Sequence, residues 1–184
     1  MSEPAGPSPD ALPAKVRTFA GDIIYPRDLR WSFRTEGATF SFNFERVPEI
    51  AQPLITAFKT VLIWYLKERS AHHANAVFFR VLHLIRFLAE GRSNALTAIA
   101  PVDILNYRGA LPPKQEWYLA SLSGVLCRWN DLGCAGVPVE TADLLRNLRL
   151  PGNEKGEAVR TFDPVAGPLT EIEFSRSEEH TSEL

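Results

Sequence analysis

Residues 70–91 read SAHHANAVFFRVLHLIRFLAEG, and this stretch predicts one long amphipathic helix. Its apolar residues recur at intervals of three and four, the period of an α-helix that buries one face. Ser70 can accept a hydrogen bond at the start of the helix, and Glu90-Gly91 marks its end. A helix with one apolar face needs other elements to cover it. The residues predicted to be buried are Ala74, Val77, Phe78, Val81, Leu82, Ile85 and Leu88.

Helical periods also occur on both sides of this stretch. Residues 49–69 predict a helix of about five turns, and residues 101–111 predict a short helix that Pro101 opens. Pro112-Pro113 should end that helix and start a fourth, which Gly133 terminates, while residues 141–148 suggest a brief fifth. The predicted fold class is mainly α, with a bundle of four to five helices over residues 48–150.

Before the helices, residues 15–47 lack the helical period. Residues 39–44 alternate polar and aromatic side chains, the pattern of a half-buried strand, and residues 23–25 and 29–33 are expected to pair with them. We therefore expect a small antiparallel β flap ahead of the bundle. Residues 1–14 are rich in proline and should form a disordered lead.

After the helices, residues 151–168 combine proline and glycine with little apolar content and predict a linker. Residues 169–175 look like the capped first turn of a further element, because Thr170 stands three residues before Glu173. The last nine residues, 176–184, have no apolar period and resemble the translation of a sequencing-adapter oligonucleotide. We exclude them from the fold as an artefact.

Charge is distributed unevenly along the chain of 184 residues, whose formal net charge is -2. Residues 48–150 are mildly basic, whereas residues 151–184 are acidic and mask that excess. No leader with a basic and then an apolar segment is present, and no stretch approaches the ~18 apolar residues of a membrane span. We expect a cytoplasmic protein without a membrane contact.

The sequence offers no pattern for a cofactor, a metal or a small-molecule substrate. Glycine-rich phosphate loops, the Gly-x-Ser-x-Gly elbow and paired carboxylates are missing. His72 and His73 diverge by about 100° on a helix and have no further ligand at the i+4 spacing. Cys127 and Cys134 match no paired zinc spacing, and we expect both to be reduced and structural.

The order of these helices resembles one protein family. A long helix, a Ser-capped helix ending at 85–91 (IRFLAEG), a short helix opened by Pro-x-Asp and a helix containing 119–129 (LASLSGVLCRW) are together similar to the SAM-like core-binding domain of phage-integrase-type tyrosine recombinases. Residues 152–170 are similar to the junction that precedes the catalytic domain in some integrases. The resemblance covers about residues 48–175.

The resemblance implies a DNA-binding fragment of a site-specific integrase, with duplex DNA and other integrase subunits of the full-length parent as partners. The family's catalytic domain supplies an Arg, a Lys, a His-x-x-Arg pair and a nucleophilic Tyr. These groups would lie beyond Phe174, so we expect no DNA cleavage by this chain alone. His83 and Arg86 spell His-x-x-Arg, but they fall on the second helix, ahead of any catalytic domain, and we interpret the match as chance.

In the family, the second and fourth helices cross the duplex. The resemblance therefore implies that Arg80, Lys114 and Arg128 contact phosphates. Glu116 would oppose a phosphate if it pointed inward. Polar side chains that would reach phosphates or base edges are His72, His73, Gln115 and Ser121.

Two other interpretations stay open. The same residues are compatible with an ordinary solvated helix face. A different class of function is a helical protein-interaction or regulatory module without DNA binding, in which exposed Phe79, Phe87 and Trp117 dock onto a partner protein.

Overall fold

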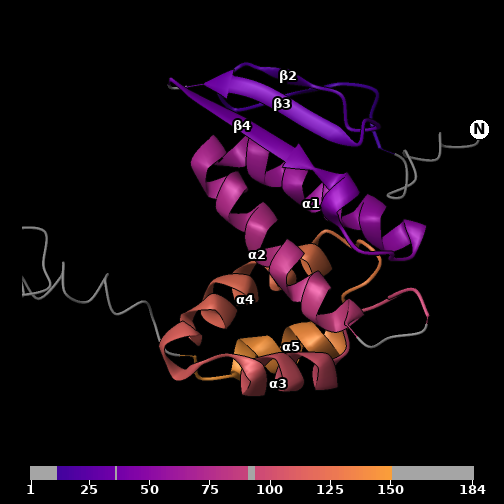
Figure 1. The fold of residues 1–184 in the computed structure, drawn as a ribbon, viewed down its shortest axis with the longest axis vertical. Coiled ribbons are helices and arrows are strands. Elements are labelled where there is room, and N and C mark those ends of the chain that lie inside the picture. The colour runs from indigo at the N-terminus through magenta and orange to yellow at the C-terminus, as the bar shows by residue number, and fades with distance from the viewer. Residues whose placement is uncertain (1–11, 36, 91–93, 151–184) are drawn as a thin grey trace, which may run out of the picture. The chain divides into compact units, whose positions relative to one another are not determined.

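The computed structural model describes residues 12–35, 37–90 and 94–150, and the part up to Leu148 forms one compact unit. The predictions for residues 1–11, 151–168, 169–175 and 176–184 lie outside the described residues. Within the described part, short antiparallel strands precede five α-helices, so the predicted mainly α class is confirmed. Figure 1 shows the strands stacked on the two long helices, with the three later helices on the other side.

The longest strands, β3 (Arg30–Thr35) and β4 (Ala38–Asn43), form the hairpin that the alternation at residues 39–44 predicts. Trp31 pairs with Phe42 and Phe33 with Phe40, so one face of the hairpin is aromatic and buried. The pairing expected for residues 23–25 is wrong. Strand β2 (Ile23–Ile24) pairs instead with β1 (Val16–Arg17). A turn in which the Thr18 amide donates to Asp22 O at 2.8 Å joins these two strands.

The two long helices, α1 (Gln52–Glu68) and α2 (Ala71–Ala89), are joined by only two residues. Helix α1 starts three residues later than predicted, because Ile50 pairs with Leu96 and the Ala51 amide donates to Leu96 O at 2.9 Å. The predicted cap of α2 is confirmed, since Ser70 Oγ accepts from the His73 amide at 3.3 Å. All the residues predicted to be buried on α2 are buried, and Leu84 joins them.

The later helices are α3 (Pro101–Ala110), α4 (Trp117–Asp131) and α5 (Val139–Asn147). Pro112-Pro113 does not start α4 directly. A 3-10 turn (Pro113–Gln115) intervenes, in which the Gln115 amide donates to Pro112 O at 2.7 Å. Gly133 ends α4 with a φ of 66°, a conformation in which a glycine costs less than other residues.

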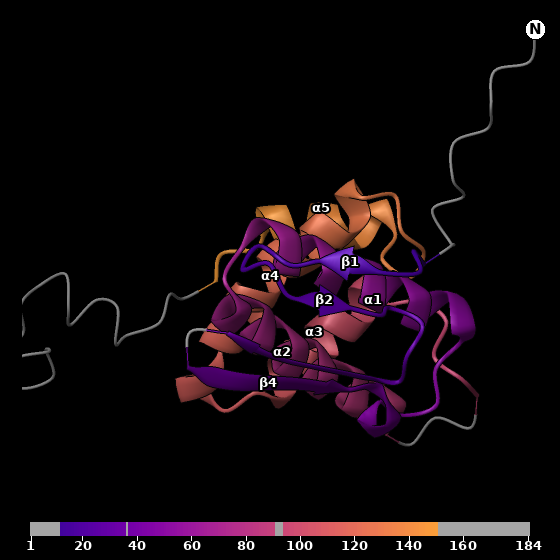
Figure 2. The ribbon, with the colours of Figure 1, turned by 90° about the horizontal axis from the view of Figure 1, so that it is seen from above.

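An aromatic core joins the flap to the bundle. Phe44, directly after β4, packs on Phe58 of α1 with ring centroids 5.7 Å apart, and Phe58 stacks on Trp129 of α4 at 6.0 Å. Phe42 of β4 packs on Phe78 of α2 at 5.2 Å. Figure 2, viewed from above, shows the strands laid across α1 and α2. The flap and the helices therefore share one hydrophobic core.

Lys59 of α1 fixes the flap in place. Its side chain is only 5% exposed, and Nζ donates to Pro26 O at 3.0 Å and to Asp28 O at 2.8 Å. The ammonium also lies 4.8 Å from the centroid of the Phe44 ring. Burial lowers the pKa of Lys59, and the nearby Asp28 carboxylate opposes this change.

Among the described residues, no helix is long and apolar enough to cross a membrane. Cys127 is a half-buried free thiol, and Cys134 is buried. Burial raises the pKa of the Cys127 thiol, whose Sγ lies 3.7 Å from Ala142 O on α5. This environment agrees with a packing role for Cys127.

Candidate nucleic-acid interface

One surface combines the polar faces of α2 and α4. His73 and Arg80 are seven residues apart on α2 and share a face, as do Trp117, Gly124 and Arg128 on α4. Arg80 Cζ lies 5.3 Å from the centroid of the Trp117 ring, while His73 and Gly124 line the same pocket. The two helices therefore run in opposite directions where they meet, and their polar faces join into one surface. We call this surface the α2/α4 face.

Four basic side chains gather on or beside the α2/α4 face, and we call them the basic cluster: Arg69, His73, Arg80 and Arg128. Arg69 is the residue that ends α1, directly before the cap of α2. Partial burial lowers the pKa of His73, and the positive charges of Arg69 and Arg80 lower it further. Within residues 12–35, 37–90 and 94–150, no carboxylate forms an ion pair with any of the three arginines.

Aromatic rings support the basic cluster. Arg128 Cζ lies 4.5 Å from the centroid of the Trp64 ring, and the His73 ring stacks on Tyr65 with centroids 5.2 Å apart and planes at 12°. Burial raises the pKa of Tyr65, while the positive charges of Arg128 and Arg69 act in the opposite direction. A guanidinium held over a ring loses rotamer freedom before any ligand arrives. The cluster is therefore partly preorganised.

A small pocket lies within the basic cluster, at the end of α1, the start of α2 and the middle of α4. Its volume is about 240 Å³. The residues that line it are Trp64, Tyr65, Arg69, His73, Gly124 and Arg128.

The structure brings His73, Arg80 and Arg128 together among the residues that the sequence singles out. His72 is exposed, but its ring packs edge-on against Phe40 of β4 at 4.9 Å, so it also contacts the flap. Ser121 is half-buried, and its hydroxyl donates to Tyr118 O at 2.8 Å. Gln115 is exposed in the 3-10 turn ahead of α4. The side chain of Lys114 lies outside what the structure describes.

Sequence reasoning missed Arg69, Trp64 and Tyr65. Each belongs to the last turns of α1 or to its end, where the apolar period gives no information about neighbouring helices. The sequence feature that could have identified these residues is the short link between α1 and α2. Two residues between helices place the end of one helix beside the start of the next. With that link in view, an arginine directly before Ser70 is a candidate for the α2/α4 face.

Glu116 does not oppose an anion on the α2/α4 face. Its Oε1 accepts from Arg108 Nε at 2.9 Å, and the two side chains are 29% and 34% exposed. Arg108 belongs to α3, so the carboxylate is neutralised by a neighbouring helix. The concern that the start of α4 would repel phosphate therefore does not apply in this structure.

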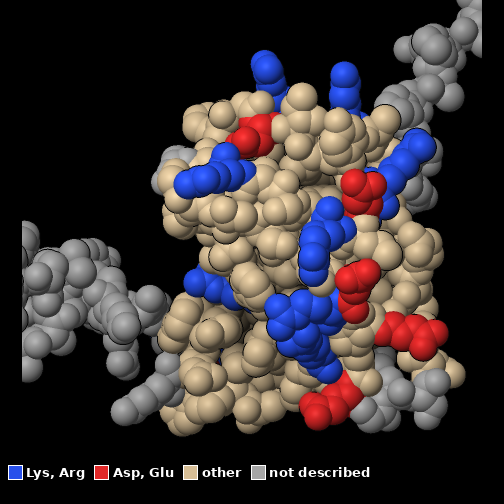
Figure 3. Space-filling view, turned by 45° about the horizontal axis from the view of Figure 1, so that its top comes forward, with Lys and Arg blue, Asp and Glu red and all other residues tan. Residues whose placement is uncertain are grey.

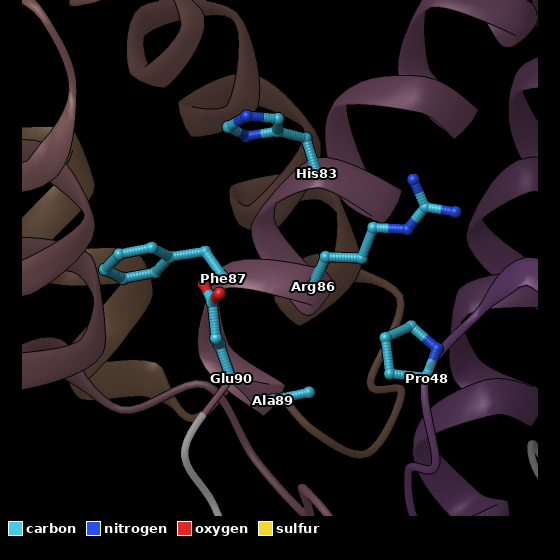
Figure 4. A pocket seen from close by; sticks show the side chains of 6 residues that line it. All are labelled: Pro48, His83, Arg86, Phe87, Ala89 and Glu90. Atoms are coloured by element: carbon cyan, nitrogen blue, oxygen red, sulfur yellow. The ribbon is translucent and has the colours of Figure 1, made fainter.

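A second pocket, of about 470 Å³, lies beside the C-terminal half of α2. His83 Nδ1 lies 2.8 Å from the Tyr107 hydroxyl, and Arg86 donates to the backbone carbonyl of Arg46 at 3.2 Å. Figure 4 shows the His83 ring and the Arg86 guanidinium leaving α2 in different directions, so they do not converge on one point. The full lining is Pro48, His83, Arg86, Phe87, Ala89 and Glu90.

The apolar residues of the protein-interaction alternative differ in exposure. Phe79 is 44% exposed, as expected. Phe87 and Trp117 are only partly exposed, which corrects the expectation, because Phe87 packs on Tyr107 at 5.3 Å and Trp117 on Tyr118 at 4.4 Å. No apolar patch formed by all three residues is therefore freely available on this surface.

The face drawn in Figure 3 carries Lys and Arg side chains beside Asp and Glu side chains, with one group of basic side chains near its middle. Other basic side chains lie along the top and at both sides of this view, so positive charge is not confined to the central group. In the part of the chain that the structure describes, no group of three or more His, Cys, Asp and Glu side chains is placed to hold a metal ion.

Comparison of the chain with protein-family models, with curated proteins and with solved structures finds no match. The fold and the candidate site together describe a mainly helical protein. Its α2/α4 face is basic, and aromatic rings support the basic side chains.

Proposed function

We propose that this helical unit binds duplex DNA through the α2/α4 face, as the N-terminal core-binding part of a site-specific integrase of the tyrosine-recombinase class. The observation that carries the proposal is the basic cluster. It draws Arg69, Arg80 and Arg128 from three helices onto one surface, without a carboxylate partner among the described residues. DNA phosphates are the partners that such a surface fits, because each contact releases condensed counterions.

The aromatic supports strengthen this proposal. Ordering a free arginine on binding costs rotamer entropy, whereas Arg80 over Trp117 and Arg128 over Trp64 are partly ordered beforehand. A guanidinium that stacks by its face also leaves its N–H edge free to donate to phosphate oxygens. Stacking and phosphate binding are therefore compatible in one side chain.

In this proposal, the polar side chains beside the basic cluster recognise the DNA sequence. Gln115 is exposed, and Ser121 keeps acceptor capacity after its hydroxyl donates within α4. Such groups read base edges when phosphate contacts hold a helix at a groove. The proposal concerns DNA binding only and assigns no cleavage step to His83 or Arg86.

A titration of labelled duplex DNA with the full chain tests the proposal. Binding should be detectable at ~50 mM salt and much weaker at ~200 mM, because phosphate contacts dominate it. Absence of binding at the lower concentration would reject the proposal.

The alternative, a protein-interaction module, is favoured by one observation, the 44% exposure of Phe79 in the middle of α2. Sedimentation at several protein concentrations separates the two functions. Self-association that neither DNA nor moderate salt changes, and that Phe79→Ser abolishes, would support the interaction module.

A further inference from the structure

The pocket inside the basic cluster is too small for a large organic ligand. Its volume of about 240 Å³ lies below the range of ~300–1,000 Å³ that drug-sized ligands occupy. It is open to solvent through the α2/α4 face, and its residues come from α1, α2 and α4. The size therefore fits a small chemical group rather than a whole nucleotide.

The residues that line the pocket favour a negatively charged ligand. Arg69 and Arg128 both line it, no carboxylate does, and neither arginine is paired with an acid in the described part of the chain. His73 adds an imidazole that is held against Tyr65. Two guanidinium groups and an imidazole offer several N–H donors from different directions, and a tetrahedral anion with several acceptor oxygens can use them together.

Gly124 indicates that the pocket is kept open. It lies in the middle of α4, where glycine is less favourable than alanine, and its backbone does not adopt a positive φ. A Cβ at this position would meet no atom within 4 Å, so packing inside the chain does not require a glycine. Gly136 is different, because a Cβ there would collide with the Leu54 side chain. The space next to Gly124 is therefore not filled by any other described residue.

We infer that this pocket binds a single phosphate group, held between Arg69 and Arg128, with Gly124 leaving room for its oxygens. The inference rests on the proposed function for the source of the phosphate, which is the DNA backbone. Free phosphate has the same chemistry and is the other source. Arg80, at the other end of the face, contacts DNA outside the pocket.

The experiment compares Gly124→Leu, which fills the pocket, with Gly124→Ala as the matched control in the full chain. Both substitutions favour the helix, so a folding defect is not expected, and thermal melting checks this. In DNA titrations over a series of salt concentrations, Gly124→Leu should reduce the slope of log affinity against log salt by about 0.9, the value of one phosphate contact. Gly124→Ala should change the slope much less. Arg69→Gln, which removes charge without adding volume, should act like Gly124→Leu.

Inorganic phosphate serves as the second probe, with the amide resonance of Gly124 as the readout. A saturable shift that Arg69→Gln removes supports the pocket, and a wild-type DNA slope in Gly124→Leu and in Arg69→Gln overturns its contact with DNA. If Arg80→Ala still lowers the slope in that case, DNA binding stands and the pocket inference fails. If no DNA binds but phosphate shifts Gly124, the pocket stands with free phosphate as its ligand and the proposed function fails. Absence of both signals overturns both.

Discussion

Replacement of Arg80 and Arg128 by alanine should change the salt dependence of DNA binding by an amount that the structure defines. Arg69, Arg80 and Arg128 are the arginines of the basic cluster, and none of them has an acidic partner in the described residues. If Arg80 neutralises one phosphate and the Arg69–Arg128 pocket a second, the slope of log affinity against log salt is about -1.8, from ~0.9 for each contact. A rise from ~50 to ~200 mM salt then weakens binding by about 12-fold.

Each substitution should remove one of these contacts. Arg80→Ala or Arg128→Ala alone should give a slope of about -0.9, so that affinity falls only about 3-fold over the same interval, and the double variant should give a slope near zero. Arg34→Ala is the matched control, because Arg34 is an exposed arginine on the outward face of β3, outside the basic cluster. Fluorescence anisotropy with a labelled duplex at four or more salt concentrations measures the slopes.

A conservative variant separates the effect of charge on DNA binding from the effect of side-chain geometry. Arg128→Lys keeps the positive charge but loses the planar stacking on Trp64, so it should keep the slope and lose affinity at every salt concentration. A double variant with the slope of the wild-type chain would refute the role of the basic cluster. So would a control variant, Arg34→Ala, that lowers the slope as much as Arg80→Ala does.

Three further predictions concern single side chains. His73 has a lowered pKa in the folded chain, so the unfolded chain binds more protons and stability should fall as pH drops through ~6.5. His73→Gln should reduce this loss in thermal melts from pH 7.5 to pH 5.5, whereas an unchanged pH profile would contradict the lowered pKa of His73. Lys59→Met should lower the free energy of unfolding, measured in urea, by about 2 kcal/mol, because it removes charged hydrogen bonds to the carbonyls of Pro26 and Asp28. A change near zero would show that Lys59 does not hold the flap. Phe58→Ala should cost about 3–5 kcal/mol by the same measurement, since Phe58 joins the flap to α4. A smaller cost than that of Lys59→Met would contradict a shared core.

Local patterns predicted the helices well because each signal lies within the helix itself. Ser70 caps α2 and Gly133 ends α4, and both act through contacts a few residues away. The start of α1 was predicted wrongly because pairing with Leu96, far along the chain, holds Ile50 extended. The partner of β2 was also wrong, since the alternation of a strand reports which face is buried and not which strand lies beside it.

The candidate interface could be predicted only in part for the same reason. The period of α2 and α4 placed His73, Arg80 and Arg128 on polar faces, but no period states that these faces adjoin. Trp64 supports Arg128 from a helix whose pattern suggested only burial. Contacts of this kind depend on how helices cross, and that is fixed by packing of the whole core.

The arginines of the α2/α4 face differ from other arginines of the described residues in the rings beneath them, since exposed Arg34 also lacks an acidic partner. Arg108 pairs with Glu116, and Arg146 pairs with Asp131 at 2.7 Å and with Asp143 at 2.8 Å. Those arginines have their charge neutralised within the protein. On the α2/α4 face, Arg80 and Arg128 rest on tryptophan rings instead, which orient the guanidinium without neutralising it. A surface that only needs to stay hydrated gains little from such orientation. Oriented and unneutralised cations are useful when a negative partner arrives, and this is the physical basis on which we propose DNA as the partner of this face.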